Sequence, residues 1–470
     1  MKNRNLTQGS IIKALLQLAL PIAGGQFMHM AHGLTDMFWL GQSSSSAYAI
    51  AATGTAGLFI WLSVGLMLVG RVGAEIGVSQ SRGRDDVPEA YRYARTSLFL
   101  AAGLGVLYGA FLFIFRSPLI GLFRFQEANV AAYTITYMGI MAFGIPASFI
   151  TSSISGTFNA SGNSRTPFII SALGIALNMT LSPIFILGLD MGVVGAGITS
   201  VTAQYAVLAA MLIAVKRFKS RPFAVFKLTE KFDLSAIRKD FTSGKARDIF
   251  RLTWPVCLEN TLFPLLTMAT TYFEVAFGSF AVSISRVGTQ VESLSWLVGA
   301  GFGAALTAFV GQNFGAGKHE RINAGVRYTT VFMLGWGLLV ACVLWFGSPV
   351  ILVAFLPDFA DDPDMVRLVV SNLRILAACQ VFSNLEFVAT NAFRGKGRTL
   401  PPSITGITSN VIRVPLAFVL SRFTPLGLLG VWVAISATAA FRGVSVFIWY
   451  QVEKKREDRR AQPHTAMGAD

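Results

Sequence analysis

Long apolar stretches separated by short polar gaps run along almost the whole chain of 470 residues. A helix needs about 20 apolar residues to cross the hydrocarbon core of a bilayer, and twelve stretches are long enough. Several exceed the bilayer thickness, which helix tilt accommodates. We therefore predict an all-α integral membrane protein with twelve transmembrane helices, at residues 11–40, 47–79, 92–116, 130–158, 166–188, 192–216, 250–277, 286–314, 325–356, 364–393, 400–421 and 426–451.

The distribution of Lys and Arg among the polar gaps decides the orientation. An even number of spans places both termini on one side of the membrane. The positive-inside rule assigns the side richer in Lys and Arg to the cytoplasm. Thirty of the 39 Lys and Arg residues fall on the side of the termini, and only five fall on the other side. We predict an inner (plasma) membrane protein with both termini in the cytoplasm.

The composition excludes other classes of protein. Only 13% of the residues are charged and the mean hydropathy is +0.58, whereas a soluble domain carries roughly 25% charge. The net charge of +15 comes from Lys and Arg in the gaps, without the exposed aromatic side chains that nucleic-acid binding uses. We expect membrane lipid as a partner, no nucleic acid, and a monomer.

The two halves of the chain repeat each other. The segment 174–183 recurs as 406–415 at a shift of 232 residues, and Gln80 corresponds to Gln312 at the same shift. Six spans per half with the same orientation indicate a parallel repeat, which is typical of transporters with alternating access. We predict a first lobe at 1–216, a basic linker at 217–249, a second lobe at 250–452 and a cytoplasmic tail at 453–470.

The sequence lacks the motifs of an ATP-driven transporter and of an enzyme. The glycine-bearing segments 80–85 and 311–318 do not fit the GxxxxGK[ST] pattern of an ATP-binding loop, so transport must use an ion gradient. A membrane-embedded enzyme would need a nucleophile–base pair or a metal site. Four scattered His and three Cys do not offer one, so we expect no catalytic residue and no cofactor beyond a coupling ion.

Charged side chains inside spans are the main candidates for function, because each costs about 2.5–3.5 kcal/mol to insert. Asp36 is the strongest, and His32 lies four residues earlier on the same helix face. A carboxylate there can bind a proton or ligate Na⁺. Glu259 could meet a cationic substrate or a proton, or it could pair with an arginine on a neighbouring helix. Glu386 could face a cavity, because Arg374, three turns earlier, is too far away to pair with it along the helix.

Other polar residues have simpler interpretations. Glu75 can pair with Arg71, four residues earlier on one helix. We expect Glu274 and Glu292, near the predicted span ends, to be solvated. Spans 5 and 6 carry hydroxyl and amide groups that are candidates for function only if they face Asp36. These residues are Asn178, Ser182, Thr199, Ser200 and Thr202.

Several segments resemble the MATE (multidrug and toxic compound extrusion) transporters, especially the prokaryotic NorM-like and DinF-like members. They are Leu20-Pro21 with Gly33–Gly41, Asn178–Gly188 with Gly192–Gly197, Glu292–Leu294, Gly311–Gly317 and Arg394–Thr399. The resemblance covers nearly the whole chain. It implies a twelve-helix antiporter that exports cationic, amphipathic compounds in exchange for H⁺ or Na⁺.

The resemblance also implies roles for individual residues. Asp36 matches an aspartate used for ion coupling, and Asn178 matches an asparagine of the same site. Ser200 or Thr199 approximates its hydroxyl, and Glu259 matches a glutamate important in some members. Many members have Asp where this chain has Ser182, and some have Asp where it has Ser383. A site with one carboxylate favours H⁺, while Na⁺ bound by Asp36, Asn178, Ser182 and Ser200 is the alternative.

We therefore predict an ion-driven multidrug antiporter, coupled through Asp36 with Asn178, Ser182, Thr199 and Ser200. Its substrate would bind near His32, Glu259 and Glu386. The alternative is a flippase for a lipid or a lipid-linked saccharide in the same superfamily. That function would favour an arginine-rich cavity, so it depends on whether the intramembrane arginines are paired; they are Arg71, Arg374, Arg413 and Arg442.

Overall fold

The computed structural model describes residues 5–461 apart from 43–45, 124, 126, 218–243, 357, 358 and 360. Within these residues the chain is helical, and none of them forms a strand. Most of the predicted linker 217–249 and the end of the tail lie outside them. The first six predicted spans correspond to α1 (Ile11–Gly41), α2 (Ser46–Gly83), α3 (Val87–Gly121), α4 (Ala128–Ala160), α5 (Arg165–Pro183) with the π-helix η1 (Ile184–Gly188), and α6 (Gly192–Arg217).

The remaining six spans correspond to seven helices, because the predicted span 325–356 is broken. Gly347 caps a new helix whose first turn contains a proline, and proline is well suited to that position since its missing N–H is not needed there. The helices are α8 (Lys245–Val275), α9 (Ser279–Gly315), α10 (His319–Phe346), α11 (Ser348–Phe355), α12 (Pro363–Gly395), α13 (Leu400–Arg422) and α14 (Leu428–Ala461).

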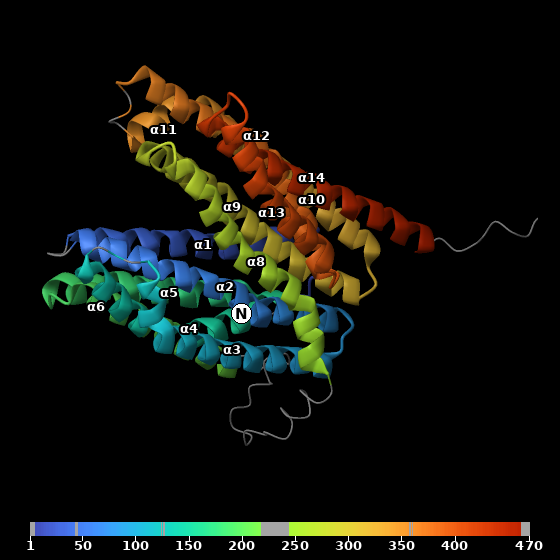
Figure 1. Cartoon of the computed structure of the whole chain (residues 1–470). Coiled ribbons are helices and arrows are strands. Elements are labelled where there is room, and N and C mark those ends of the chain that lie inside the picture. The colour runs from blue at the N-terminus through green and yellow to red at the C-terminus, as the bar shows by residue number, and fades with distance from the viewer. Residues whose placement is uncertain are drawn as a thin grey trace, which may run out of the picture. The chain divides into compact units, whose positions relative to one another are not determined.

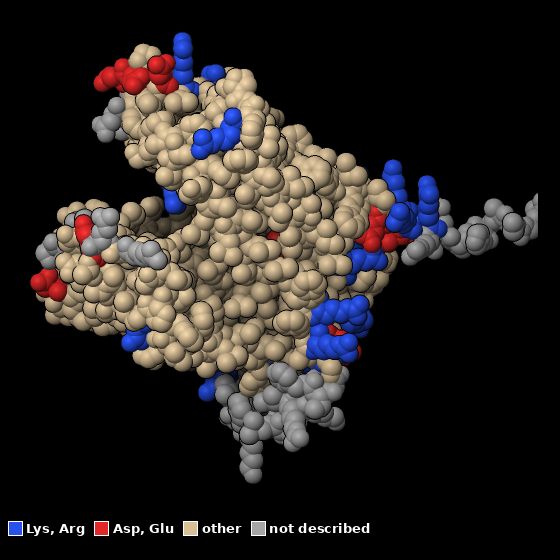
Figure 2. All heavy atoms as spheres, in the orientation of Figure 1, with Lys and Arg blue, Asp and Glu red and all other residues tan. Residues whose placement is uncertain are grey.

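The helices have the length and composition of membrane spans. Among the described residues, eleven are long and apolar enough to cross a bilayer. The predicted span that is not among these is α8, which is 31 residues long but more polar. In Figure 2 most of the charged side chains in view gather near helix ends, and other residues form the surface along the helices. The predicted all-α membrane architecture is confirmed.

The chain divides into two compact units. The first comprises Met1–Pro264, Ala300–Gly325 and Arg394–Gly397. In it α4 packs against α2, α3 and α6, while α5 packs against α1 and α6 (Figure 1). The interior between α2, α3 and α4 is filled by apolar side chains, among them Met138, Ile145 and Phe149. Helices α1, α5 and α6 also contact one another, and these three helices carry most of the polar residues named above around Asp36.

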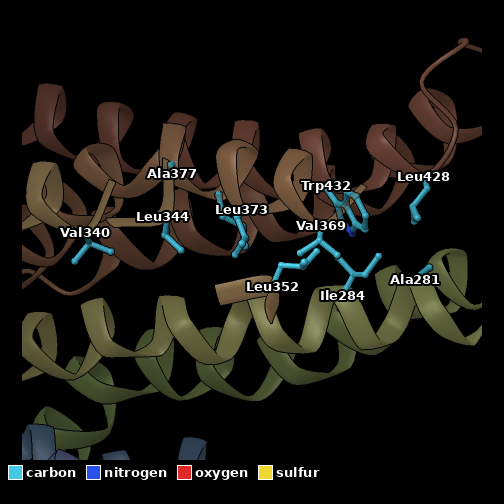
Figure 3. Packing of buried hydrophobic residues seen from close by; sticks show 11 residues of the cluster. Ala281, Ile284, Val340, Leu344, Leu352, Val369, Leu373, Ala377, Leu428 and Trp432 are labelled. Carbon is cyan, nitrogen blue, oxygen red and sulfur yellow. The ribbon is translucent and has the colours of Figure 1, made fainter. Parts of the chain in front are cut away.

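The second unit comprises Leu265–Gly299, Val326–Phe393 and Arg398–Asp470. Figure 3 shows its main apolar cluster, in which side chains of α9, α10, α11, α12 and α14 meet. Trp432 of α14 is 1% exposed there. Lipid tails are as apolar as leucine, so this cluster stabilises the unit by close packing rather than by removal from water.

Candidate functional site

The carboxylate of Asp36 belongs to a polar cluster inside the first unit. Its Oδ1 atom lies 3.2 Å from Ser182 Oγ on α5. Its Oδ2 atom lies 3.6 Å from Nε2 of His32, one turn earlier on α1. The side chains of Asp36 and His32 are 17% and 25% exposed, so both retain access from outside the cluster.

Helices α5 and α6 supply the rest of the cluster. The amide nitrogen of Asn178 donates to Ser200 Oγ at 3.4 Å. Ser182 Oγ lies 3.3 Å from Asn178 Oδ1 and 3.4 Å from Thr199 Oγ1. All four side chains are buried. Three helices thus bring five side chains together, at positions 36, 178, 182, 199 and 200.

The local backbone explains how α5 and α6 come so close. Pro183 has no N–H to continue the helical hydrogen bonds, and the chain passes there from α5 into η1. A turn follows, with positive φ at Asp190 and Gly192. Gly195 of α6 then packs against the backbone of Phe185, where an added Cβ would lie only 2.7 Å from the carbonyl oxygen. This contact holds the start of α6 against η1, which continues directly from α5.

The hydroxyl of Ser182 has several oxygens within reach and only one proton. Its oxygen lies close to oxygens of Asp36, Asn178 and Thr199, and Thr199 has the carbonyl of Ala196 as another acceptor, at 3.1 Å. A proton on Asp36, or a Na⁺ ion among these oxygens, would add a positive partner at this point.

A transition-metal site is not built into the described part of the chain. No group of three or more His, Cys, Asp and Glu side chains among those residues is arranged to hold a metal ion. The donor set around Asp36 consists of one carboxylate, one amide oxygen and hydroxyl oxygens. Oxygen ligands of this kind suit hard cations rather than metals that prefer thiolate or imidazole.

The two other predicted substrate residues are Glu259 on α8 and Glu386 on α12. Glu259 is half-buried on α8 in the first unit. Glu386 lies on α12 in the second unit, where its Oε2 atom is 2.7 Å from Nε of Arg442 on α14. The bonds that hold the Asp36 cluster together involve neither residue.

The Glu386–Arg442 ion pair allows a first prediction. Both side chains are mostly buried, at 16% and 12% exposed. Removing one charge leaves the other without compensation, which costs up to about 3–5 kcal/mol in a buried pair. We expect Glu386→Gln and Arg442→Gln each to lower the thermal unfolding temperature in detergent. The double variant should recover much of the loss, and a double variant as unstable as the sum of the singles would contradict the pairing.

The other intramembrane arginines also have partners within their own units. Arg71 pairs with Glu75 at 3.1 Å, as predicted from their spacing. Arg413 donates to Thr438 Oγ1 at 3.0 Å. The guanidinium of Arg374 lies over the ring of Trp345, 5.2 Å from its centroid. Because each arginine is engaged, the arginine-rich cavity expected of a lipid-linked saccharide flippase is not favoured.

Two acidic residues were expected to be solvated, and both expectations were wrong. Glu292 is 7% exposed and accepts a hydrogen bond from Gln380 Nε2 at 3.1 Å. The predicted span began at residue 286, but α9 begins at Ser279, so Glu292 lies well inside the helix. A carboxylate this far from a helix end needs partners from other helices.

Glu274 does lie at the end of α8, but its neighbours bury it to 4% exposed. It accepts hydrogen bonds from Ser285 Oγ at 2.7 Å and from Trp432 Nε1 at 3.2 Å. The three residues come from α8, α9 and α14. A buried tryptophan normally requires a partner for its N–H, but the sequence does not reveal which acceptor faces it.

Comparison with known proteins gives consistent results. The MatE family model matches residues 21–184 and 255–419. The two matches begin 255 − 21 = 234 residues apart, in agreement with the internal repeat. The chain is 27% identical over 446 residues to the probable multidrug resistance protein NorM of Thermotoga maritima, covering 94% of this chain and 92% of that one. It is 26% identical to the probable multidrug resistance protein YpnP of Bacillus subtilis, covering 96% and 97%.

Solved structures share the fold. One is described as the outward-facing conformation of a multidrug resistance MATE family transporter of the MOP superfamily. It superposes with a TM-score of 0.84 at 22% identity, over 97% of this chain and 98% of that chain. A MOP superfamily transporter from Pyrococcus furiosus, described as having a binding pocket of reverse polarity, also gives 0.84, at 21% identity.

Proposed function

Because the chain belongs to the MatE family, which consists of transporters and not enzymes, we propose that it is a secondary active exporter of cationic or amphipathic small molecules. It would work as an antiporter by alternating access, with H⁺ as the ion that enters while substrate leaves. Both termini would lie in the cytoplasm. Relatives described as probable multidrug resistance proteins support the export of foreign compounds.

The observation that carries this proposal is the cluster around Asp36. A coupling ion must bind at one stage of the cycle and be released at another. A single carboxylate among buried hydroxyl and amide groups is suited to this exchange, since a change of one hydrogen bond alters its proton affinity. The Ser182 contact at 3.2 Å is such a bond, and it joins α1 to α5.

The cluster favours H⁺ over Na⁺ because it holds one carboxylate. By the family resemblance, Ser182 of this chain stands where a second acid is common. A hydroxyl oxygen contributes less negative charge to a cation than a carboxylate does, whereas a single carboxylate is sufficient to carry a proton.

Substrate cations would be attracted by the carboxylates of Glu259 and Glu386, and His32 would contribute a further polar contact. Glu386 could take part only after releasing Arg442, since the two now form an ion pair at 2.7 Å. Glu259 is half-buried on α8 in the first unit, which also holds the Asp36 cluster. We therefore assign it the larger share of substrate recognition.

The choice of ion can be tested with purified protein in liposomes. Uptake of a fluorescent organic cation into liposomes would be followed after a pH jump, and separately after a Na⁺ jump at constant pH. We expect transport with the pH gradient and none with the Na⁺ gradient. Transport driven by Na⁺ alone would contradict H⁺ coupling, and no transport with either gradient would contradict the antiport itself.

Introducing a second acid at position 182 gives a further prediction. Ser182→Asp would place another carboxylate beside Asp36 and form the oxygen-rich site that a monovalent cation needs. We expect this variant to gain Na⁺-driven transport and to lose part of its response to the pH gradient. Ser182→Asn is the control, because asparagine has the same size as aspartate but no charge, and this variant should gain no Na⁺ response. If the two variants behave alike, the charge at position 182 does not choose the ion.

A further inference from the structure

The ends of α2 and α9, both in the first unit, carry two glutamines that are equivalent in the internal repeat. Gln80 of α2 donates from Nε2 to the carbonyl of Gly395, the last residue of α12, at 2.9 Å. Gln312 of α9 donates from Nε2 to the carbonyl of Ala160, the last residue of α4, at 2.7 Å. Each glutamine thus satisfies a carbonyl that has no partner within its own helix, and that carbonyl belongs to the opposite half of the chain.

The same two helices also touch backbone to backbone. A Cβ added to Gly83 would collide with the carbonyl oxygen of Gln312, and one added to Gly315 would collide with that of Gln80. Gly83 and Gly315 are 232 residues apart, so this contact is reciprocal as well. Neither glycine has a positive φ. Close approach, rather than backbone conformation, therefore explains why they lack side chains.

A short N-terminal segment, Leu6–Gly9, is tied to this crossing of α2 and α9. Leu6 is 1% exposed, and its N–H donates to Gln312 Oε1 at 3.0 Å. Lys318 donates to the carbonyl of Thr7 at 2.9 Å, and Arg321 donates to that of Gly9 at 3.0 Å. Gln312 therefore uses one end of its amide on this segment and the other on α4.

We propose that the α2–α9 crossing is a seal that opens and closes in each transport cycle, with Gln80 and Gln312 as gating residues and Leu6–Gly9 as a strap that holds it shut. The inference rests on the proposed transport function. By the predicted orientation, the seal closes the cytoplasmic side.

The chemistry of the contact suits repeated opening. Neutral amide–carbonyl hydrogen bonds contribute little net stability, since both groups bind water when they separate. The glycines present no side chains that would interlock across the crossing. The apolar packing of Met138, Ile145 and Phe149 has no such polar replacement, so it is expected to stay intact. Because the two glutamine bonds are equivalent in the repeat, a single movement of one half against the other would break both.

A reversible disulfide tests the seal directly. A Cβ on Gly311 would lie 2.8 Å from the Cβ of Ser79, and a disulfide needs about 3.5–4.5 Å. Ser79→Cys with Gly311→Cys can therefore form a bridge after a small shift. The pair would be made in a variant in which Cys257, Cys342 and Cys379 are replaced by Ala. Each single cysteine variant, oxidised in the same way, is the control.

We expect oxidation to abolish pH-driven transport in the double variant and dithiothreitol to restore it, with no effect of either reagent on the controls. Full transport by the oxidised, cross-linked protein would overturn the proposal, because the seal would then be a static contact. If the parent without the cysteine pair also fails to transport with any gradient, the proposed function has failed instead.

If the double cysteine variant does not fold, hydrogen–deuterium exchange tests the opening of the seal in a chain that keeps its native cysteines. Gln312→Ala removes both amide bonds, and we expect exchange of Leu6–Gly9 and of the residues after Ala160 to rise together by roughly tenfold. Gln290→Ala, on an exposed part of α9, is the matched control and should leave both segments unchanged. A rise confined to Leu6–Gly9 would contradict a common opening.

Discussion

Asp36→Asn is expected to reduce proton-driven export to the background of protein-free liposomes while leaving the fold intact. Asparagine has nearly the same shape, and its amide can still bond to Ser182, which lies 3.2 Å from the Asp36 carboxylate. It cannot bind and release a proton in the range where the carboxylate does. Export of a fluorescent cation after a pH jump measures the loss, and the unfolding temperature shows whether the protein is still folded.

The control for this variant is Asp364→Asn, the same change at an exposed position in the first turn of α12. It should transport like the unaltered protein. Asp36→Glu keeps the charge and should retain part of the activity. Gradient-driven export that survives in Asp36→Asn would move the coupling to another acid, and Glu259 would be examined next.

Trp432→Ala is expected to give the largest loss of stability in the chain. The indole is 1% exposed within the cluster of Figure 3, and removing a buried aromatic side chain costs about 3–5 kcal/mol. The change also removes the indole N–H donor from Glu274 and Ser285, which lie 3.2 Å and 2.7 Å from Trp432 Nε1. Thermal unfolding in detergent, followed by a thiol-reactive dye or by light scattering, measures the effect.

Two controls separate packing from hydrogen bonding at this position. Trp432→Phe keeps most of the ring and loses the N–H, so it should cost clearly less than Trp432→Ala. Glu274→Gln keeps an acceptor for the indole and should be tolerated better still. If Trp432→Phe is as damaging as Trp432→Ala, the hydrogen bond and not the packing dominates.

Much of the fold could be predicted from the hydrophobic pattern. Each of the twelve predicted spans coincides with helical structure. The thickness of the bilayer sets a minimum length for an apolar helix, and stretches of that length can be recognised in the sequence. The cluster around Asp36 was also accessible in part. Asn178 and Ser182 lie four residues apart, so they had to share a face of one helix. Their contact with Asp36 depends on how α1 packs against α5, which came only from the resemblance.

The features that could not be predicted from the sequence depend on which helices pack against one another. Glu274 finds Ser285 and Trp432 on two other helices, and Glu292 finds Gln380 on α12. No periodicity within one helix indicates such partners, because they are fixed by packing angles and by register between helices. The start of α9 at Ser279 was missed because Gly278 and the serines at 279, 283 and 285 interrupt the apolar pattern. The break at Gly347 was missed because the apolar residues on both sides of Gly347-Ser348-Pro349 were taken together as one span.

In the proposed antiporter, Asp36 carries the proton that is exchanged for substrate, so substrate binding should displace this proton. Calorimetry in buffers of different ionisation enthalpy measures this directly, since it counts the protons released per substrate bound. We predict release of about one proton per substrate near the pH at which transport is fastest, and none from Asp36→Asn. Equal release from both proteins, or none from either, would contradict the account.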